Sequence, residues 1–181
     1  MVIGHWALVS PGVRHLRPDS WHLFHYNPDM IRKFIAFIAA LALMTVPCAA
    51  VDESALSALL EGTKFHYTRL EAGLWTIPFE GHSLSSYNVF VTSNEGVVLV
   101  FVVVADHDSF EETPELVRAL LRCNVDLDRI KVGIDDDGDV FARIDLTERI
   151  LDARELSENI DQAAAAADEI YRRIAPYLAS P

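Results

Sequence analysis

The stretch Val97–Ala105, VVLVFVVVA, is an unbroken run of nine apolar residues, six of which are valine. Valine and phenylalanine are common in β-strands, where their side chains pack well on a pleated surface. A strand with one face in water would alternate apolar and polar residues, and this stretch does not alternate. It therefore predicts a strand in the middle of a sheet, with a dry neighbour above and below it.

Three shorter strands are predicted upstream of this run. One of them contains Pro78, which has no N–H to donate, so we expect that segment at a sheet edge or at the end of a strand. Asn94-Glu95-Gly96 supplies a short turn into the central strand, with Gly96 available for a positive φ. The three predicted strands are Lys64–Leu70, Leu74–Phe79 and Tyr87–Thr92.

Two helices and two further strands are predicted downstream. Thr113 and Pro114 are a good helix start, with threonine as the cap and proline at the first helical position. Asp152 with Glu155 resembles a capping box and opens a long final helix. The first helix carries an apolar stripe of Leu116, Val117, Leu120 and Leu121, and the strands are Arg129–Ile134 and Val140–Leu146.

A helix at Ser54–Leu60, ended by Gly62, precedes all of these elements. The resulting order is α-β-β-β-β-α-β-β-α, which is typical of an α+β fold. We expect an antiparallel sheet with helices packed mainly on one side. Residues 51–181 are long enough for one core and too short for two ordinary domains, so they form a single predicted domain.

The charge of the chain excludes some classes of partner. Its 181 residues include 15 Lys and Arg and 27 Asp and Glu, a formal net charge of -12. Most of the acidic excess lies in residues 51–181, and nucleic-acid binding requires Lys and Arg that neutralise phosphates. Nucleic acid and an anionic lipid surface are therefore poor partners for this domain.

Residues 30–50 have the pattern of a secretory signal peptide. Arg32 and Lys33 precede a 13-residue, mostly apolar run, Phe34–Val46, and small residues follow it. We expect cleavage after Ala50 and export to the periplasm or the extracellular space. The alternatives are an uncleaved membrane anchor and a lipoprotein modified at Cys48. Residues 1–29 precede the signal and are interpreted as an upstream extension that is not translated, with Met30 as the true start.

The segments from 120 to 146 resemble the YbjN-domain family, whose members are described as bacterial sensory transduction regulators. The resemblance is best in the helix end Leu120–Asn124, the strand Arg129–Ile134, the Asp/Gly turn and the strand Val140–Leu146. It extends over roughly Ser54 to Leu178. These residues form a pattern of fold and contain no catalytic signature.

The resemblance implies a fold like that of type III secretion chaperones, in which a sheet and helices bind another polypeptide and commonly pair into dimers. It implies no reaction and no cofactor. Secretion chaperones act in the cytoplasm, whereas this chain has a predicted export signal. The resemblance therefore implies the fold and leaves the secretion role in doubt.

Two groups of acidic residues and histidines are candidates for chemistry. Asp135–Asp139 is rich in carboxylates that suit calcium, but its spacing does not fit an EF-hand loop, and a hairpin turn is the simpler interpretation. Asp106, His107 and Asp108 follow the central strand, where a metal site or a base would be well placed. Consecutive residues point in different directions, so a structural loop is favoured there too. His66 and His82 are further candidates for the same cluster.

These observations favour a non-enzymatic, exported interaction module of YbjN type, which binds a protein partner or a second copy of itself. The candidate interaction surface is one face of the central strand, because an apolar face without a helix needs a partner to cover it. It consists of Val98, Val100, Val102 and Val104. Two alternatives remain: a monomer whose N-terminal helix covers that face, and a metal- or ligand-binding protein or metal-dependent enzyme built on Asp106, His107 and Asp108.

Overall fold

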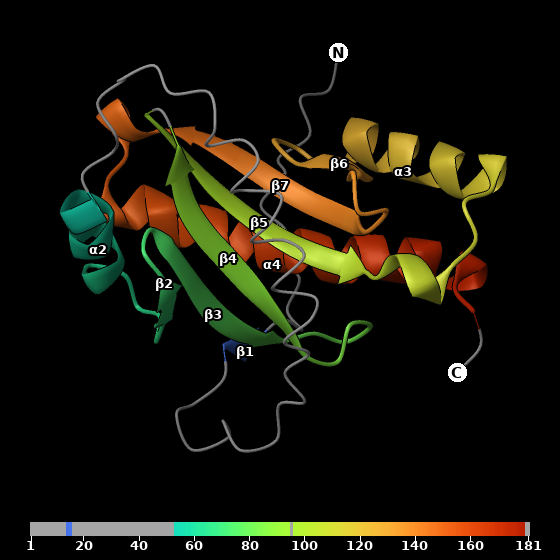
Figure 1. Ribbon diagram of the computed structural model, residues 1–181, viewed down its shortest axis with the longest axis horizontal. Coiled ribbons are helices and arrows are strands. Elements are labelled where there is room, and N and C mark those ends of the chain that lie inside the picture. The colour runs from blue at the N-terminus through green and yellow to red at the C-terminus, as the bar shows by residue number, and fades with distance from the viewer. Residues whose placement is uncertain (1–13, 16–52, 95, 180–181) are drawn as a thin grey trace, which may run out of the picture.

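The computed structural model describes residues 14–15, 53–94 and 96–179. These residues form a seven-stranded antiparallel sheet with helices on one side, shown in Figure 1. The helices are α2 (Glu53–Glu61), α3 (Pro114–Asp126) and α4 (Ala153–Ile174). The strands are β1 (Arg14–His15), β2 (Thr68–Glu71), β3 (Leu74–Glu80), β4 (Tyr87–Asn94), β5 (Val97–Ala105), β6 (Lys131–Ile134) and β7 (Val140–Thr147).

From residue 53 onward, the order of helices and strands is the predicted one, and the α+β class is confirmed. The strands lie in the order β1-β3-β4-β5-β7-β6, and β2 also pairs with β3. The predicted central strand is β5, which lies between β4 and β7. The prediction of a mid-sheet position is therefore confirmed.

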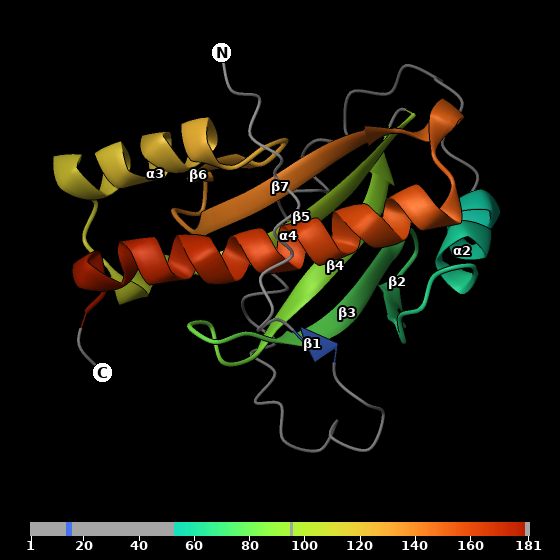
Figure 2. The ribbon, with the colours of Figure 1, turned by 180° about the vertical axis from the view of Figure 1, so that it is seen from behind.

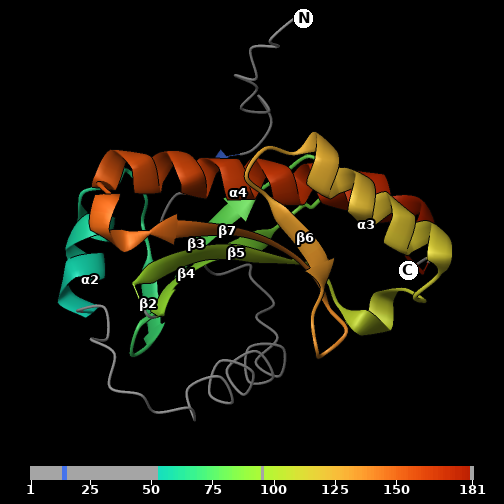
Figure 3. The ribbon, with the colours of Figure 1, turned by 90° about the horizontal axis from the view of Figure 1, so that it is seen from above.

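The long helix α4 covers one face of the sheet, as Figures 2 and 3 show from behind and from above. Four of its ten buried residues are alanines, Ala163, Ala164, Ala166 and Ala167. Small side chains allow the helix axis to approach the strands closely, and the branched residues of β5 fill the remaining space. The main core is formed between this helix and the sheet, and residues of α2 and α3 complete it.

The predicted interaction surface on β5 is wrong. Its four valines face α4 and belong to the main core, where they are 0–3% exposed. Side chains alternate along a strand, so these four residues share one face, and α4 covers that face. The residues are Val98, Val100, Val102 and Val104.

The other face of the sheet carries a second, smaller apolar cluster. Phe90 and Phe101 are stacked there, with ring centroids 5.1 Å apart, and Leu74 joins them. Among the described residues, every member of this cluster lies on a strand. The first helix does not cover this face, because Leu56 and Leu60 of α2 belong to the main core. On this face of β5 Phe101 is 4% exposed, whereas Val97, Leu99 and Val103 are half-buried, so the dry neighbour that the composition predicted covers this face only in part.

The position of Pro78 has a simple explanation in the strand register. Strand β3 pairs with β4 along one side, where Pro78 lies opposite Asn88. On its other side β2 pairs with residues 74–76 and β1 pairs with residues 79–80. Pro78 falls in the gap between these two short strands, where a missing N–H costs no ladder hydrogen bond.

The helix ends follow the capping residues in the sequence. The hydroxyl oxygen of Thr113 accepts a hydrogen bond from the Leu116 N–H at 3.2 Å, and Pro114 is the first residue of α3. The carboxylate of Asp152 accepts from the Glu155 N–H at 2.7 Å at the start of α4. Both predicted starts are confirmed. None of the helices in the described part of the chain is long and apolar enough to cross a membrane.

Asn124, at the end of α3, binds the backbone of β6. Its side-chain Nδ2 donates to the Val132 carbonyl at 2.8 Å, and its Oδ1 accepts from the Val132 N–H at 2.9 Å. The amide thus makes the same pair of hydrogen bonds that a residue of a neighbouring strand would make. This asparagine ends the helix segment in the quoted resemblance, and the structure gives it a role in holding α3 against β6.

The predicted signal peptide at residues 30–50, its cleavage after Ala50 and the interpretation of residues 1–29 concern the chain outside the described ranges. The exception is β1, whose Arg14 and His15 pair with Glu80 and Phe79 of β3.

Candidate interaction surface

The helix α3 lies beside β6 at the side of the sheet and packs against α4. Its buried residues are Leu116, Leu120 and Cys123. Burial raises the pKa of the Cys123 thiol. Because α3 lies beside the sheet and not across it, only a narrow side of the helix is covered.

The outer side of α3 exposes large apolar side chains. Leu121 is 61% exposed and Val125, one helical turn later, is 84% exposed. Val117, one turn earlier, is half-buried. The sequence predicted one apolar stripe that includes Leu120 and Leu121, and the structure divides it, with Leu120 buried and Leu121 exposed. We call Val117, Leu121 and Val125 the α3 stripe.

Exposed apolar side chains are rare elsewhere in the described part of the chain. Ile150 is the third large one, at 64% exposed, and it lies in the short helix Glu148–Ile150. Single exposed apolar residues are ordinary on protein surfaces, whereas rows of them mark interaction sites. The α3 stripe therefore is the candidate interaction surface.

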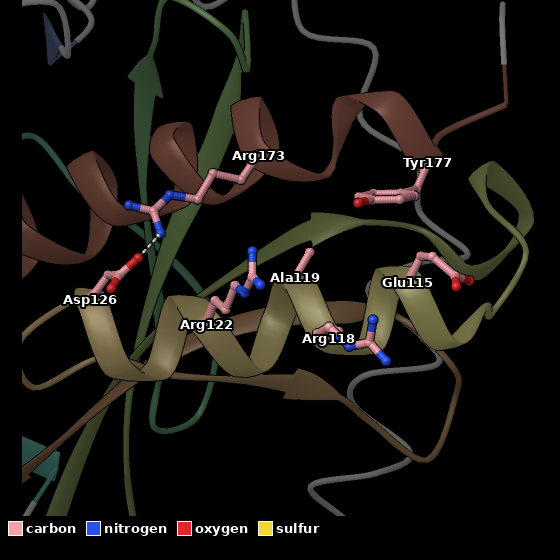
Figure 4. A pocket seen from close by; sticks show the side chains of 7 residues that line it. All are labelled: Glu115, Arg118, Ala119, Arg122, Asp126, Arg173 and Tyr177. Atoms are coloured by element: carbon pink, nitrogen blue, oxygen red, sulfur yellow. Dashed lines mark hydrogen bonds and ion pairs between the residues drawn. The ribbon is translucent and has the colours of Figure 1, made fainter.

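A pocket of about 470 Å³ lies between α3 and the end of α4, on another side of α3. Figure 4 shows its lining, with arginines from both helices. Arg173 of α4 donates to Asp126 at 2.7 Å and to Glu169 at 2.7 Å. The lining residues are Glu115, Arg118, Ala119, Arg122, Asp126, Arg173 and Tyr177.

The hydrogen bonds that Arg172 and Arg173 make with Glu169 keep Arg173 and Glu169 in their charged forms. The side-chain hydrogen bond to Glu169 raises the pKa of Arg173, and the hydrogen bond from Arg172 lowers the pKa of Glu169. Both shifts favour the charged forms. Sequence reasoning missed this pocket because Arg173 and Asp126 are 47 residues apart, and only the packing of α4 on α3 brings them together.

The histidine predicted as a possible metal ligand has a structural partner. His107 donates its backbone N–H to Asp139 at 2.8 Å, and its Nδ1 lies 3.2 Å from the same carboxylate oxygen. Its Nε2 lies 3.1 Å from Asp108. The contact with Asp139 joins the end of β5 to the hairpin between β6 and β7.

A metal centre is not formed by the predicted residues. His66 precedes β2 and His82 lies in the loop between β3 and β4. Among the residues that the structure describes, no three or more His, Cys, Asp or Glu side chains are grouped so that they would hold a metal ion. His107 thus contacts Asp139, which belongs to the other candidate cluster of the sequence, Asp135–Asp139.

The Asp135–Asp139 segment is a hairpin turn, as the simpler interpretation proposed. Oδ1 of Asp135 accepts from the N–H groups of Asp137 and Asp139, at 3.0 and 2.9 Å. Gly138 has φ of +88° and donates its N–H to the Asp135 carbonyl. Burial raises the pKa of the Asp135 carboxyl. Its hydrogen bonds stabilise the turn, which accounts for an acidic residue at this place.

The chain is similar to one protein family and to solved structures. The family model YbjN, described as "Putative bacterial sensory transduction regulator", matches residues 52–176. No curated protein matches the sequence. Among solved structures, the chain is similar to one from the heterodimeric complex ExoU-SpcU of the Pseudomonas aeruginosa type III secretion system. That alignment has a TM-score of 0.44 and 14% identity, and it covers 70% of this chain and 99% of the other.

Proposed function

Because the chain belongs to the YbjN family, we propose that it is a non-enzymatic module that binds another polypeptide, and that the α3 stripe is its binding surface. The observation that carries this proposal is the exposure of Leu121 and Val125 on one side of α3. The valines of β5 are buried against α4 and are not available as a binding surface. The family description of a sensory transduction regulator supports a binding role.

The small size of the stripe favours a short segment of a different protein as its partner. A stable interface between two globular proteins buries about 800 Å² on each side, with about 20–30 residues. Three side chains on one helix provide much less. They suit a short amphipathic segment that lays its own apolar side chains along the helix.

We also propose that the protein acts after export. The sequence pattern of Arg32, Lys33 and the apolar run Phe34–Val46 supports this proposal. The test is the N-terminal residue of the protein recovered from the cell envelope or the medium. Val51 as the first residue is the expected result, and an intact N-terminus in the cytoplasmic fraction contradicts export.

Replacing Leu121 and Val125 together by serine is expected to weaken partner binding by at least about tenfold. Burial of one large apolar side chain is worth about 1.5–3 kcal/mol, and about 1.4 kcal/mol corresponds to a factor of ten. Because both side chains are exposed, the free energy of unfolding should change by only about 0.5 kcal/mol. The matched control is Ile150→Ser, which removes an exposed apolar side chain elsewhere.

The measurement has two stages. Affinity capture with the natural chain, the double variant and the control first identifies proteins that the double variant alone fails to retain. The affinity of the purified partner for each form is then measured by titration. A partner that binds all three forms equally contradicts the proposed surface. A chain that captures nothing and stays monomeric at all concentrations contradicts the proposed function, and a stripe-dependent dimer would identify a second copy as the partner.

A further inference from the structure

The pocket between α3 and α4 gathers positive charge in an acidic protein. The chain has 27 acidic and 15 basic residues, and three of its arginines line this one cavity. They come from two helices, Arg118 and Arg122 from α3 and Arg173 from α4. Side chains of like charge repel one another at close range, so a group of three arginines is unfavourable unless negative charges offset them.

Arg173 is accounted for by the fold. Its guanidinium group binds Asp126 and Glu169 and so links α3 to α4. These two carboxylates neutralise it. Arg173 thus forms one wall of the pocket and is not available as a free positive charge.

Arg118 and Arg122 are not accounted for in this way. The side chain of neither arginine has a hydrogen bond or an ion pair with any of the described residues. They stand four residues apart on α3, a spacing at which like charges destabilise a helix by about 0.2–0.5 kcal/mol. Both side chains are exposed, and both residues line the same cavity.

Nearby carboxylates do not pair with them, although helical spacing would allow it. Asp126 is four residues after Arg122, but its carboxylate binds Arg173. Glu115 is three residues before Arg118, and Figure 4 shows its carboxylate turned away from the other lining side chains. Figure 4 also shows the Tyr177 hydroxyl turned toward the middle of the pocket, where it adds a neutral donor.

We infer that this pocket binds a small organic phosphate monoester. Two free guanidinium groups match the two negative charges of such a phosphoryl group, and guanidinium binds phosphate oxygens with two parallel N–H donors. The volume of about 470 Å³ is larger than a phosphate ion needs and lies in the range of small-molecule pockets. The ring of Tyr177 supplies an apolar wall for the organic part. This site is separate from the α3 stripe and does not depend on the proposed protein partner.

The test is calorimetric titration of the full chain with phenyl phosphate and, separately, with inorganic phosphate. We expect saturable binding of one phenyl phosphate per chain and weaker binding of inorganic phosphate. The double variant Arg118→Ala/Arg122→Ala should lose at least about tenfold in affinity, because each charge-assisted hydrogen bond contributes about that much. Arg154→Ala is the matched control, since Arg154 is an exposed arginine of α4 that pairs with Glu158 outside the pocket.

Two further variants separate binding from general effects of charge. Arg122→Lys keeps the charge and loses the fork of donors, so it should retain part of the affinity. Glu115→Gln removes a negative charge from the pocket and should tighten binding by a few fold. Thermal unfolding of each variant checks that the fold is intact.

Three results would overturn the inference. One is equal binding of phenyl phosphate by the double variant and by Arg154→Ala, which would indicate that the ligand does not bind at Arg118 and Arg122. Another is inorganic phosphate binding as tightly as phenyl phosphate, which would leave the organic group without a role. The third is no detectable binding of phenyl phosphate at any concentration tested, with all forms folded.

Discussion

Replacing Val100 by aspartate is expected to unfold the protein under conditions in which the natural chain is folded. Val100 is fully buried between Val91 of β4 and Ile144 of β7, on the face that α4 covers. A carboxylate at this place has no partner and no water, and its burial costs several kcal/mol. We expect a loss of more than about 4 kcal/mol, against a total stability of about 5–15 kcal/mol for a domain.

The matched control is Val103→Asp, which makes the same change three residues later in the same strand. Val103 is half-buried and lies on the opposite face, so water reaches part of the new carboxylate. Urea unfolding followed by circular dichroism gives the free energy of unfolding for both variants. We expect Val103→Asp to lose at least about 2 kcal/mol less than Val100→Asp. Equal losses would contradict the assignment of the two faces.

Replacing Gly81 by alanine is the second change with a large expected effect. A Cβ atom at this position would clash with Oδ1 of Asp168 and lie 2.8 Å from the Leu84 carbonyl oxygen. That same Oδ1 accepts hydrogen bonds from the N–H groups of Ser83 and Leu84, at 2.7 and 2.8 Å. The carboxylate must move, and the loop between β3 and β4 then loses its anchor on α4.

The expected loss is about 3 kcal/mol or more, since hydrogen bonds to a charged group contribute about 1.5–3 kcal/mol each. Gly73→Ala is the matched control. A Cβ there meets nothing within 4 Å, and only its φ of +75° makes the change unfavourable, by about 1–2 kcal/mol. Chemical denaturation of both variants measures the difference.

A double variant shows whether crowding against Asp168 is the cause. In the background of Asp168→Ala the clash with the carboxylate is gone, so Gly81→Ala should cost clearly less than it does in the natural chain. Neighbouring residues commonly show such non-additive effects. Losses that simply add would show that Gly81 and Asp168 act independently, contrary to the geometry.

The sequence predicted the fold well because its strongest signals are local. An unbroken apolar run such as Val97–Ala105 favours burial on both faces, and its place between two strands follows. Thr113 and Asp152 mark helix starts through hydrogen bonds that span three residues. These signals need no knowledge of how distant parts of the chain meet.

The candidate site was predicted less well because it depends on distant contacts. Alternation divides the residues of β5 into two faces but does not say which face α4 will cover. The apolar residues of α3 appear as one stripe, and only the helix's place beside the sheet separates buried Leu120 from exposed Leu121. His107 and Asp139 are 32 residues apart, so the charged neighbours of the histidine in the sequence were the more obvious partners.

The pair of hydrogen bonds between Asn124 and Val132 also has a consequence for how these molecules behave at high concentration. Strand β6 is the last in the sheet, and an outermost strand with free N–H and C=O groups invites the strand of another molecule to polymerise onto it. One side-chain amide occupies both groups of Val132. Val132, in the middle of this outermost strand, therefore has no free backbone group with which to pair a strand of another molecule.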